Sequence, residues 1–437
     1  MIEKDNKKVV KSWAMFDWAN SSYNLVITST IFPAYYTAIT TTEQFGDKVK
    51  FFGFDFVNTA LSNYVLAAAY LVIAMISPLL TSMADFHGNK KIFLKLFTWL
   101  GGLACAGLYF FTLETLEVSL IFFALAALGY CGGIVFINSY LPEIASKENQ
   151  DAVSAKGFAY GYVGSVILQV ICFIFVLKPE LFGITDAGFP ARLSFLLVGI
   201  WWIGFAQISI RVLPKGSPNF KAAEKVKLLN GFDNLKKVWH EVSKMTVLKK
   251  YLASYFFSAM GVQTIMLVAA SFGEKILQLG TSKLIATILI IQLVAIGGAI
   301  LMSKLSHRYG NIKVLIAVVS IWIVVCISAY FITTEYQFYV LAAVVGTIMG
   351  GIQSLSRSTF SKLIPEQTSD NASFFSFYDV TEKLAIVAGL FSFGLIEEMT
   401  GNMRYSALFL GIFFVIAISI LFSLVIKEKK SLKNYQI

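Results

Sequence analysis

The sequence predicts an all-α membrane protein of twelve transmembrane helices, arranged as two parallel six-helix repeats. Hydrophobic residues make up 57% of the 437 residues and charged residues only 14%, which is roughly half the charged share of an average soluble domain. The apolar residues come in blocks of about 20, the length at which a helix crosses a bilayer. Short patterns in the first half recur in the second half at a nearly constant offset.

The apolar blocks define the expected helices in chain order. The first six lie near residues 13–39, 57–82, 92–113, 118–141, 156–177 and 191–212. Six more lie near residues 251–272, 283–306, 312–333, 337–361, 373–396 and 404–426. The expected domains are therefore an N-terminal bundle over 1–212, a linker over 213–250 and a C-terminal bundle over 251–437.

The distribution of Lys and Arg predicts the orientation, because positively charged loops resist translocation. With the N-terminus inside, 27 of the 36 basic residues fall in inner segments and 7 in outer loops. Both termini are therefore expected in the cytoplasm, and no cleavable signal peptide is visible. The expected location is a bacterial inner (plasma) membrane.

The linker, Leu213–Lys250, has two interpretations. Its apolar residues recur at helical spacing between lysines, as in Leu235, Val238 and Val242. This pattern suits a helix that lies on the anionic inner leaflet. The alternative is a solvated hinge whose positive charge only fixes the topology.

The internal repeat has two anchors. Gly88-Asn89-Lys90-Lys91 follows the second expected helix and Gly310-Asn311-Ile312-Lys313 follows the eighth, at an offset of 222 residues. Leu141-Pro142-Glu143 and Ile364-Pro365-Glu366 end the fourth and tenth helices at an offset of 223. Two anchors with almost the same offset indicate parallel repeats.

These turns resemble the loop motif of the major facilitator superfamily, Gly-x-Leu-Ala-Asp-Arg-x-Gly-Arg-Lys. The matching residues are Asp85, Gly88, Lys90 and Lys91 in the first half and Arg308 and Gly310 in the second. The departures are Thr81 for the first Gly, Phe86 for the Arg, and His307 for the Asp of the second half.

Three stretches are similar to the vacuolar-effluxer-like family, named for a fungal vacuolar amino-acid exporter. They are Trp13–Tyr23, Gly350–Ser358, and Phe374–Tyr378 followed by Lys383. The resemblance implies a secondary transporter whose two halves rock around a central cavity, with amino acids as the candidate substrates. Members often carry an acid just before the Gly of the seventh helix, where this chain has Met260.

The first expected helix carries a polar stripe. Its members, spaced to share one helical face, are Asp17, Asn20, Ser21, Asn24 and Thr28. Such a stripe favours a cavity lining, and the alternative is hydrogen bonding between helices. Desolvation would favour the protonated form of Asp17, so this residue is a candidate for proton coupling, whereas a static ion pair would keep it charged.

The tenth helix carries Gln353 and Arg357 on one face. The planar guanidinium of Arg357 suits a substrate carboxylate. Alternatively, Arg357 pairs with Asp17 as an inner gate latch, since each lies about one turn inside the cytoplasmic end of its helix. Asp85 is expected to hold a neighbouring helix end.

The eleventh helix contains three ionisable residues. Asp379 and Lys383 have i, i+4 spacing and are expected to pair, which leaves Glu382 as the group whose protonation could change. Asn138 in the fourth helix and Gln263 and Thr264 in the seventh are candidates to bind a substrate or a neighbouring helix.

Other classes of function lack their motifs. The basic residues form no aromatic-rich face for nucleic acid, and four Cys and three His show no metal-ligand spacing. No phosphate-binding glycine loop or nucleophile–base pair is visible, so neither a cofactor nor an enzymatic activity is expected. The expected partners are a small polar metabolite, protons and the bilayer. The alternatives are a sugar or peptide facilitator and a non-transporting sensor or scaffold.

Overall fold

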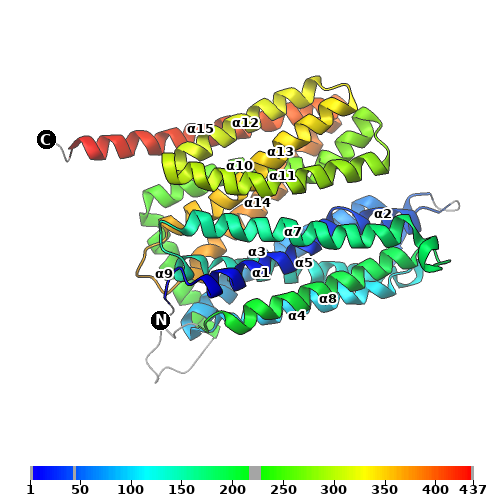
Figure 1. Cartoon of the computed structure of the whole chain (residues 1–437), viewed down its shortest axis with the longest axis horizontal. Coiled ribbons are helices and arrows are strands. Elements are labelled where there is room, and N and C mark those ends of the chain that lie inside the picture. Colours follow the sequence, from blue (N-terminus) through cyan, green and yellow to red (C-terminus); the bar gives the residue numbers. More distant parts are fainter. Residues whose placement is uncertain (1–2, 43–45, 216–227, 435–437) are drawn as a thin grey trace. The chain divides into compact units, whose positions relative to one another are not determined.

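The structure is a computed structural model that describes residues 3–42, 46–215 and 228–434. Long α-helices make up nearly all of it (Figure 1). Packing divides the chain into a first unit, Lys7–Ile137 with Tyr160–Ala222, and a second unit, Met1–Asn6 with Asn138–Ala159 and Ala223–Ile437. Division by packing thus differs from division by repeat, because residues 138–159 belong to the first repeat but to the second unit.

The first repeat contains helices that agree with the expected spans within a few residues at most ends. They are α1 (Lys7–Ser22), α2 (Ile31–Thr40), α3 (Asn58–His87), α4 (Lys90–Gly107), α5 (Leu116–Asn138), the short α6 (Leu141–Ile144), α7 (Gln150–Leu177) and α8 (Phe189–Val212). A hairpin that the sequence did not predict, β1 (Lys48–Phe51) and β2 (Phe54–Val57), lies between α2 and α3.

The second repeat follows a helix in the linker. These elements are α9 (Leu228–Lys244), α10 (Thr246–Leu277), α11 (Thr281–Tyr309), α12 (Asn311–Phe331), α13 (Glu335–Leu363), α14 (Asn371–Thr400) and α15 (Met403–Asn434). Part of the predicted linker, residues 216–227, lies outside the described residues. The helix predicted within the linker is present as α9, and its Val238 and Val242 are buried.

Twelve spans in two parallel repeats account for the fold. Among the described residues, ten helices are long and apolar enough to cross a membrane. The other two spans are the α1–α2 segment, which is interrupted, and α14, which carries the charged residues of its middle turns. The packing pairs repeat as well: α8 packs on α1 and α4 in the first unit, as α15 packs on α10 and α12 in the second.

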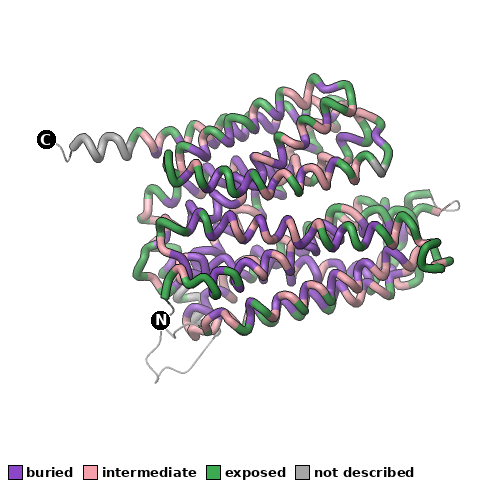
Figure 2. The backbone as a smooth tube through the Cα atoms, viewed as in Figure 1, coloured by how far each residue is buried: buried purple, intermediate pink, exposed green. Residues whose placement is uncertain are grey.

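Burial follows the membrane pattern. Buried and exposed positions alternate along the helices (Figure 2). Many exposed side chains are large and apolar, among them Met75, Val340 and Phe391. An apolar outer face suits contact with lipid. The helical backbone suits it as well, because its hydrogen bonds are made within each helix.

The first span differs from the single helix that the sequence predicted. A π-helical turn covers Tyr23–Thr28 and the α-helix resumes at Ile31. Pro33 explains the interruption, because a proline has no N–H and its ring clashes with the carbonyl four residues earlier. The hydroxyl of Thr30, between the π-helical turn and α2, donates to the carbonyl of Leu25 at 2.7 Å.

Candidate functional site

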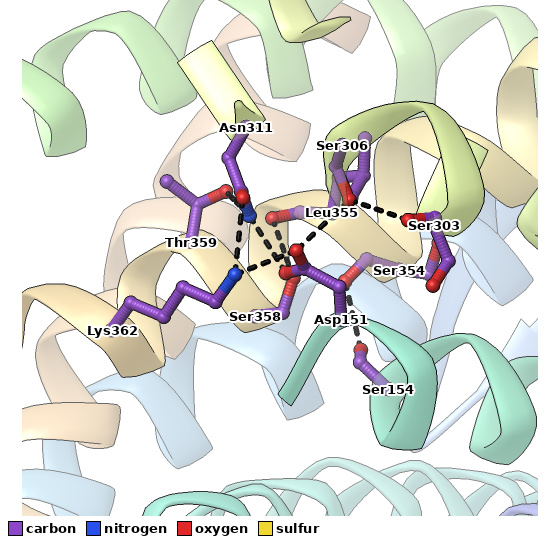
Figure 3. A network of polar contacts seen from close by, with 10 residues as sticks. All are labelled: Asp151, Ser154, Ser303, Ser306, Asn311, Ser354, Leu355, Ser358, Thr359 and Lys362. Atoms are coloured by element: carbon purple, nitrogen blue, oxygen red, sulfur yellow. Dashed lines mark hydrogen bonds and ion pairs between the residues drawn. The ribbon is translucent and has the colours of Figure 1, made fainter. Parts of the chain in front are cut away.

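The first polar cluster surrounds Asp151 in the second unit (Figure 3). Its carboxylate accepts hydrogen bonds from Ser306 Oγ at 2.9 Å, Asn311 Nδ2 at 2.7 Å and Lys362 Nζ at 2.6 Å. Lys362 Nζ also donates to Asn311 Oδ1 at 3.1 Å. We call these four residues the Asp151 network, and it joins the start of α7 to α11, α12 and α13.

Local structure explains why these residues meet. Asp151 lies in the first turn of α7 and Lys362 in the last turn of α13, so each charge complements the dipole of its own helix. Gly310 adopts a φ of 85° between α11 and α12, which a residue with a side chain rarely adopts. This sharp turn makes Asn311 the first residue of α12 and brings its amide to the carboxylate of Asp151.

Arg357 forms the second cluster, one turn and a half before Lys362 on α13. Its guanidinium donates from Nε to Ser154 Oγ at 2.9 Å, from Nη2 to Ser154 O at 2.8 Å, and from Nη1 to Asn138 Oδ1 at 3.1 Å. The guanidinium also lies 4.2 Å from the centre of the Phe158 ring, a cation–π distance. With 3% of its surface exposed, Arg357 anchors residues 138–159 to α13.

Polar contacts outside the spans extend this attachment. Lys147 pairs with Glu366 at 2.7 Å, and the hydrogen bond and charge of Lys147 lower the pKa of the Glu366 carboxyl. Burial tends to raise the pKa of Asp5, but hydrogen bonds from Ser146 and Asn149 outweigh it, and the pKa is lowered overall. Both carboxylates are therefore held in the charged form.

The third cluster, which we call the α14 ion cluster, consists of Asp379, Glu382, Lys383 and Gln263. The predicted ion pair is present, with Lys383 Nζ 3.0 Å from Asp379 Oδ1. Lys383 Nζ also lies 3.6 Å from Glu382 Oε2. From α10, Gln263 Nε2 donates to Glu382 Oε1 at 2.6 Å.

The polar stripe of the first span divides at the π-helical turn. Asp17 and Asn20 are buried, Ser21 and Thr28 are half-buried, and Asn24 is exposed. Asn24 and Thr28 lie in the π-helical turn and the other three residues in α1, so the exposed fraction changes along the stripe, and the shared face stays a prediction. The side-chain nitrogen of Asn20 is buried without a hydrogen-bond partner among the described residues.

The remaining predicted site residues are placed one by one. Thr264 is fully buried beside Gly389 of α14, Gln353 is half-buried on α13, and Asp85 is buried at the end of α3. Asp17 belongs to the first unit and Arg357 to the second. The Asp17–Arg357 pair therefore stays a prediction.

Sequence reasoning missed Asp151, Ser154 and Lys362. Helix α7 begins at Gln150, whereas the apolar block begins near residue 156. The sequence therefore places the polar turn Gln150–Ala155 in a loop. An acid in a first helical turn and a base in a last turn were the signals that could have marked Asp151 and Lys362.

Comparison with known proteins gives a family and a fold. The family described as "Vacuole effluxer Atg22 like" matches residues 5–435. An uncharacterized MFS-type transporter, YxiO, from Bacillus subtilis (strain 168) is 31% identical over 420 residues, covering 95% of this chain and 94% of that protein. Autophagy-related protein 22 from Cryptococcus neoformans is 28% identical over 298 residues, covering 62% of this chain and 49% of that protein. The chain thus matches about half the length of this fungal relative.

Solved structures share the fold at low identity. The major facilitator superfamily transporter FucP, in the outward conformation, aligns with a TM-score of 0.70 at 12% identity and covers 95% of this chain and 98% of that one. The proton:xylose symporter XylE aligns with a TM-score of 0.72 at 12% identity, covering 95% of each chain.

Proposed function

Because this chain belongs to the vacuole effluxer Atg22-like family of major facilitator transporters, we propose that it moves a small polar metabolite, with amino acids as the first candidates, across a membrane by alternating access. It acts as a secondary transporter and not as an enzyme. Its two six-helix repeats, 1–212 and 251–437, are the moving halves, and 213–250 is the linker.

The observation that carries this proposal is the attachment of residues 138–159. These residues continue α5 and lead into α7 of the first repeat, yet they belong to the same packed unit as α11, α12 and α13. The Asp151 network and Arg357 hold them there through side-chain hydrogen bonds. A gate between two halves needs contacts of this kind, since polar groups that separate can exchange their partners for water.

The distribution of Lys and Arg supports a cytoplasmic position for this gate, with both termini and the linker on the same side. Cysteines introduced in α9, for example Lys244→Cys, test the orientation in intact cells. An impermeant maleimide should label them only after the cells are opened. Labelling from outside would reverse the proposed orientation.

A counterflow assay tests the transport itself. The purified protein is reconstituted in liposomes that are loaded with one unlabelled metabolite at a time, and entry of the radiolabelled compound is followed. We expect at least one amino acid to exchange, and the matched control is liposomes that contain Asp151→Cys/Lys362→Cys closed by a bifunctional crosslinker. Failure of every amino acid, sugar and peptide in the panel would favour a sensor or scaffold that keeps the fold.

The crosslink isolates the gate from the binding site. The crosslinker should react only with the introduced cysteines, because the native cysteines are all buried, namely Cys105, Cys131, Cys172 and Cys326. Crosslinking should stop exchange, and cleavage of a reducible linker should restore it. Undiminished exchange in the crosslinked protein would show that residues 138–159 do not move away from α13 during transport.

A further inference from the structure

The α14 ion cluster carries more ionisable groups than a static ion pair needs. When Asp379, Glu382 and Lys383 are all ionised, two carboxylates share one ammonium, so these three side chains carry a net charge of −1. The exposed fraction of the side chains is 3% for Asp379 and 6% for Lys383. Asp379 Oδ2 is buried and accepts no hydrogen bond among the described residues.

The cluster lies deep in its helix. Lys383 is twelve residues from the start of α14 and seventeen from its end, which places it about 18 Å and about 26 Å from the two ends at 1.5 Å per residue. Ionisable groups at such depth are costly and usually serve a function in the interior of the protein. An excess negative charge at this place favours the binding of a positive charge.

The helices packed on α14 bring few other charges to this depth. α10 contributes no charged residue between Lys250 and Glu274, and only Gln263 bonds the cluster. Tyr255 of α10 stacks on Tyr378 of α14, with ring centres 4.2 Å apart.

Three further helices complete the surroundings. From α13, Phe360 packs on Tyr378 with ring centres 5.0 Å apart, and Arg357, three residues earlier, is bonded to Ser154 and Asn138. Lys237 of α9 pairs with Asp370 next to the start of α14. The apolar part of α15, Met403–Ile426, contains only Arg404, which donates to the carbonyl of Tyr330.

Gln263 suits both protonation states of Glu382. Its amide nitrogen donates to the carboxylate, as in the structure, and after rotation its amide oxygen can accept from a protonated carboxyl. Lys383 keeps Asp379 as its partner at 3.0 Å in either state. A metal cation fits less well, because the ammonium of Lys383 repels it and no group of three or more acidic, His or Cys side chains gathers among the described residues.

We propose that Glu382 is the proton-binding group of this transporter, so that the α14 ion cluster alternates between net charges of −1 and 0 during the cycle. The inference rests on the proposed transport function only where it says that the bound proton drives transport. The binding of the proton is a property of the cluster itself and can be measured without a substrate.

Infrared difference spectroscopy of the reconstituted full chain measures that binding. A pH change should produce the C=O stretching band of a protonated carboxyl as Glu382, whose side chain is 18% exposed, takes up its proton. Glu382→Gln should lose this band and Glu382→Asp should shift it. Glu397→Gln, which removes an acid paired with Lys275 near the end of α14, should retain it. If Glu382→Gln and wild type give the same bands, the inference is overturned, whether or not transport is found.

A second measurement links the proton to transport. Liposomes receive an imposed pH gradient and a mixture of radiolabelled amino acids as the probe. The ratio of uptake with and without the gradient should exceed one in wild type and Glu397→Gln and fall to unity in Glu382→Gln, which should still exchange substrate without a gradient. A Glu382→Gln protein that responds to the gradient like wild type would overturn the inference. A wild type that moves none of the amino acids contradicts the amino-acid proposal alone, because the infrared bands still decide the inference.

Discussion

The two repeated turns have the same sequence pattern and different structures. Gly88 is left-handed with a φ of 62° and ends α3, and its N–H bonds the carbonyl of Asp85 at 3.1 Å. Gly310 has a φ of 85° but an extended ψ of 148°, so α12 begins at the next residue. Both turns need a glycine for the positive φ. The two repeats therefore share a glycine with a positive φ at this turn, whereas the side chains around that glycine differ.

The acid of each turn has a different origin. Asp85 is buried within the first turn, whereas His307, at the equivalent position of the second turn, is exposed. The second turn takes its acid from Asp151 of α7 instead. A motif can thus lose a residue from its sequence and regain the same chemistry from a segment far away in the chain.

Two glycines extend the comparison to the spans. A Cβ at Gly161 of α7 would lie 2.5 Å from Ser21 Oγ and 3.2 Å from the carbonyl of Asp17. A Cβ at Gly389 of α14 would lie 2.3 Å from Thr264 Oγ1 and 2.5 Å from the carbonyl of Met260. The shared contact makes Asp17 equivalent to Met260, so the first span has an acid where the seventh is apolar.

The largest effect is expected from Gly389→Ala. The added methyl group would meet the backbone of Met260, which cannot move aside, and overpacking of this kind costs about 2 to 3 kcal/mol. Gly161→Ala is the matched control and should cost less, because the backbone carbonyl of Asp17 lies 3.2 Å from the added Cβ there, against 2.5 Å for that of Met260 at Gly389. Thermal unfolding in detergent measures both. Equal losses would mean that the two contacts are equally tight, which would contradict this prediction.

Asp151→Asn should have the next largest effect. The amide keeps the shape of the carboxylate but leaves the ammonium of Lys362 without its counter-charge, at a cost of about 2 kcal/mol to the attached state of residues 138–159. A cysteine introduced near residue 138 should then react with a water-soluble maleimide at a rate roughly thirtyfold higher, because the detached state is populated more by that factor. Combining it with Lys362→Met should restore part of the loss. Additive effects would indicate that the two side chains do not interact.

Asp85→Asn tests the acid of the first turn. Loss of a hydrogen bond to a charged group costs about 1.5 kcal/mol, which corresponds to a roughly tenfold slower step. We expect the turnover number to fall while the Michaelis constant stays near that of the wild type, because the role proposed for Asp85 is in the movement of the halves and not in substrate binding. Unchanged turnover with lost affinity would place Asp85 at the substrate instead.

Asp17→Asn separates the two acids proposed for the proton. Since Glu382 is the proposed proton-binding group, the Asp17 variant should transport more slowly but still respond to a pH gradient. The alternative from the sequence, coupling through Asp17, predicts that exchange without a gradient persists and that the response to the gradient disappears. The liposome assay with an imposed pH gradient distinguishes these outcomes.

The smallest effect is expected from His307→Asp, which restores the acid of the motif in the second turn. The side chain is exposed, so the change in stability should stay within about 0.5 kcal/mol. It should also fail to rescue Asp151→Asn, because an exposed carboxylate at this position cannot replace the buried one. Rescue would show that the two repeated turns use their acids interchangeably.

Most of the fold could be predicted from the sequence because a membrane span needs a long apolar block. Such a block can be recognised from the sequence without knowing how the helices pack. The sequence pattern misplaced the start of α7 because the turn Gln150–Ala155 is polar, and its burial depends on α11 and α13. The interruption of the first span is not visible in the sequence pattern, because the apolar block runs on through the π-helical turn Tyr23–Thr28 without a change in composition. The Asp379–Lys383 pair was predictable from spacing alone, whereas the contact of Gln263 with Glu382 depends on how α10 packs on α14.

The shared helix α7 has a mechanical consequence. Residues 150–159 belong to one packed unit and residues 160–177 to the other, and the whole helix of 28 residues is about 42 Å long. Such a helix acts as a lever. A tilt of about 10° around its far end would displace Asp151 by roughly 7 Å, beyond the reach of any hydrogen bond. Under the proposed function, such a tilt would release all three bonds of Asp151 together, so the proposed gate would open in one step.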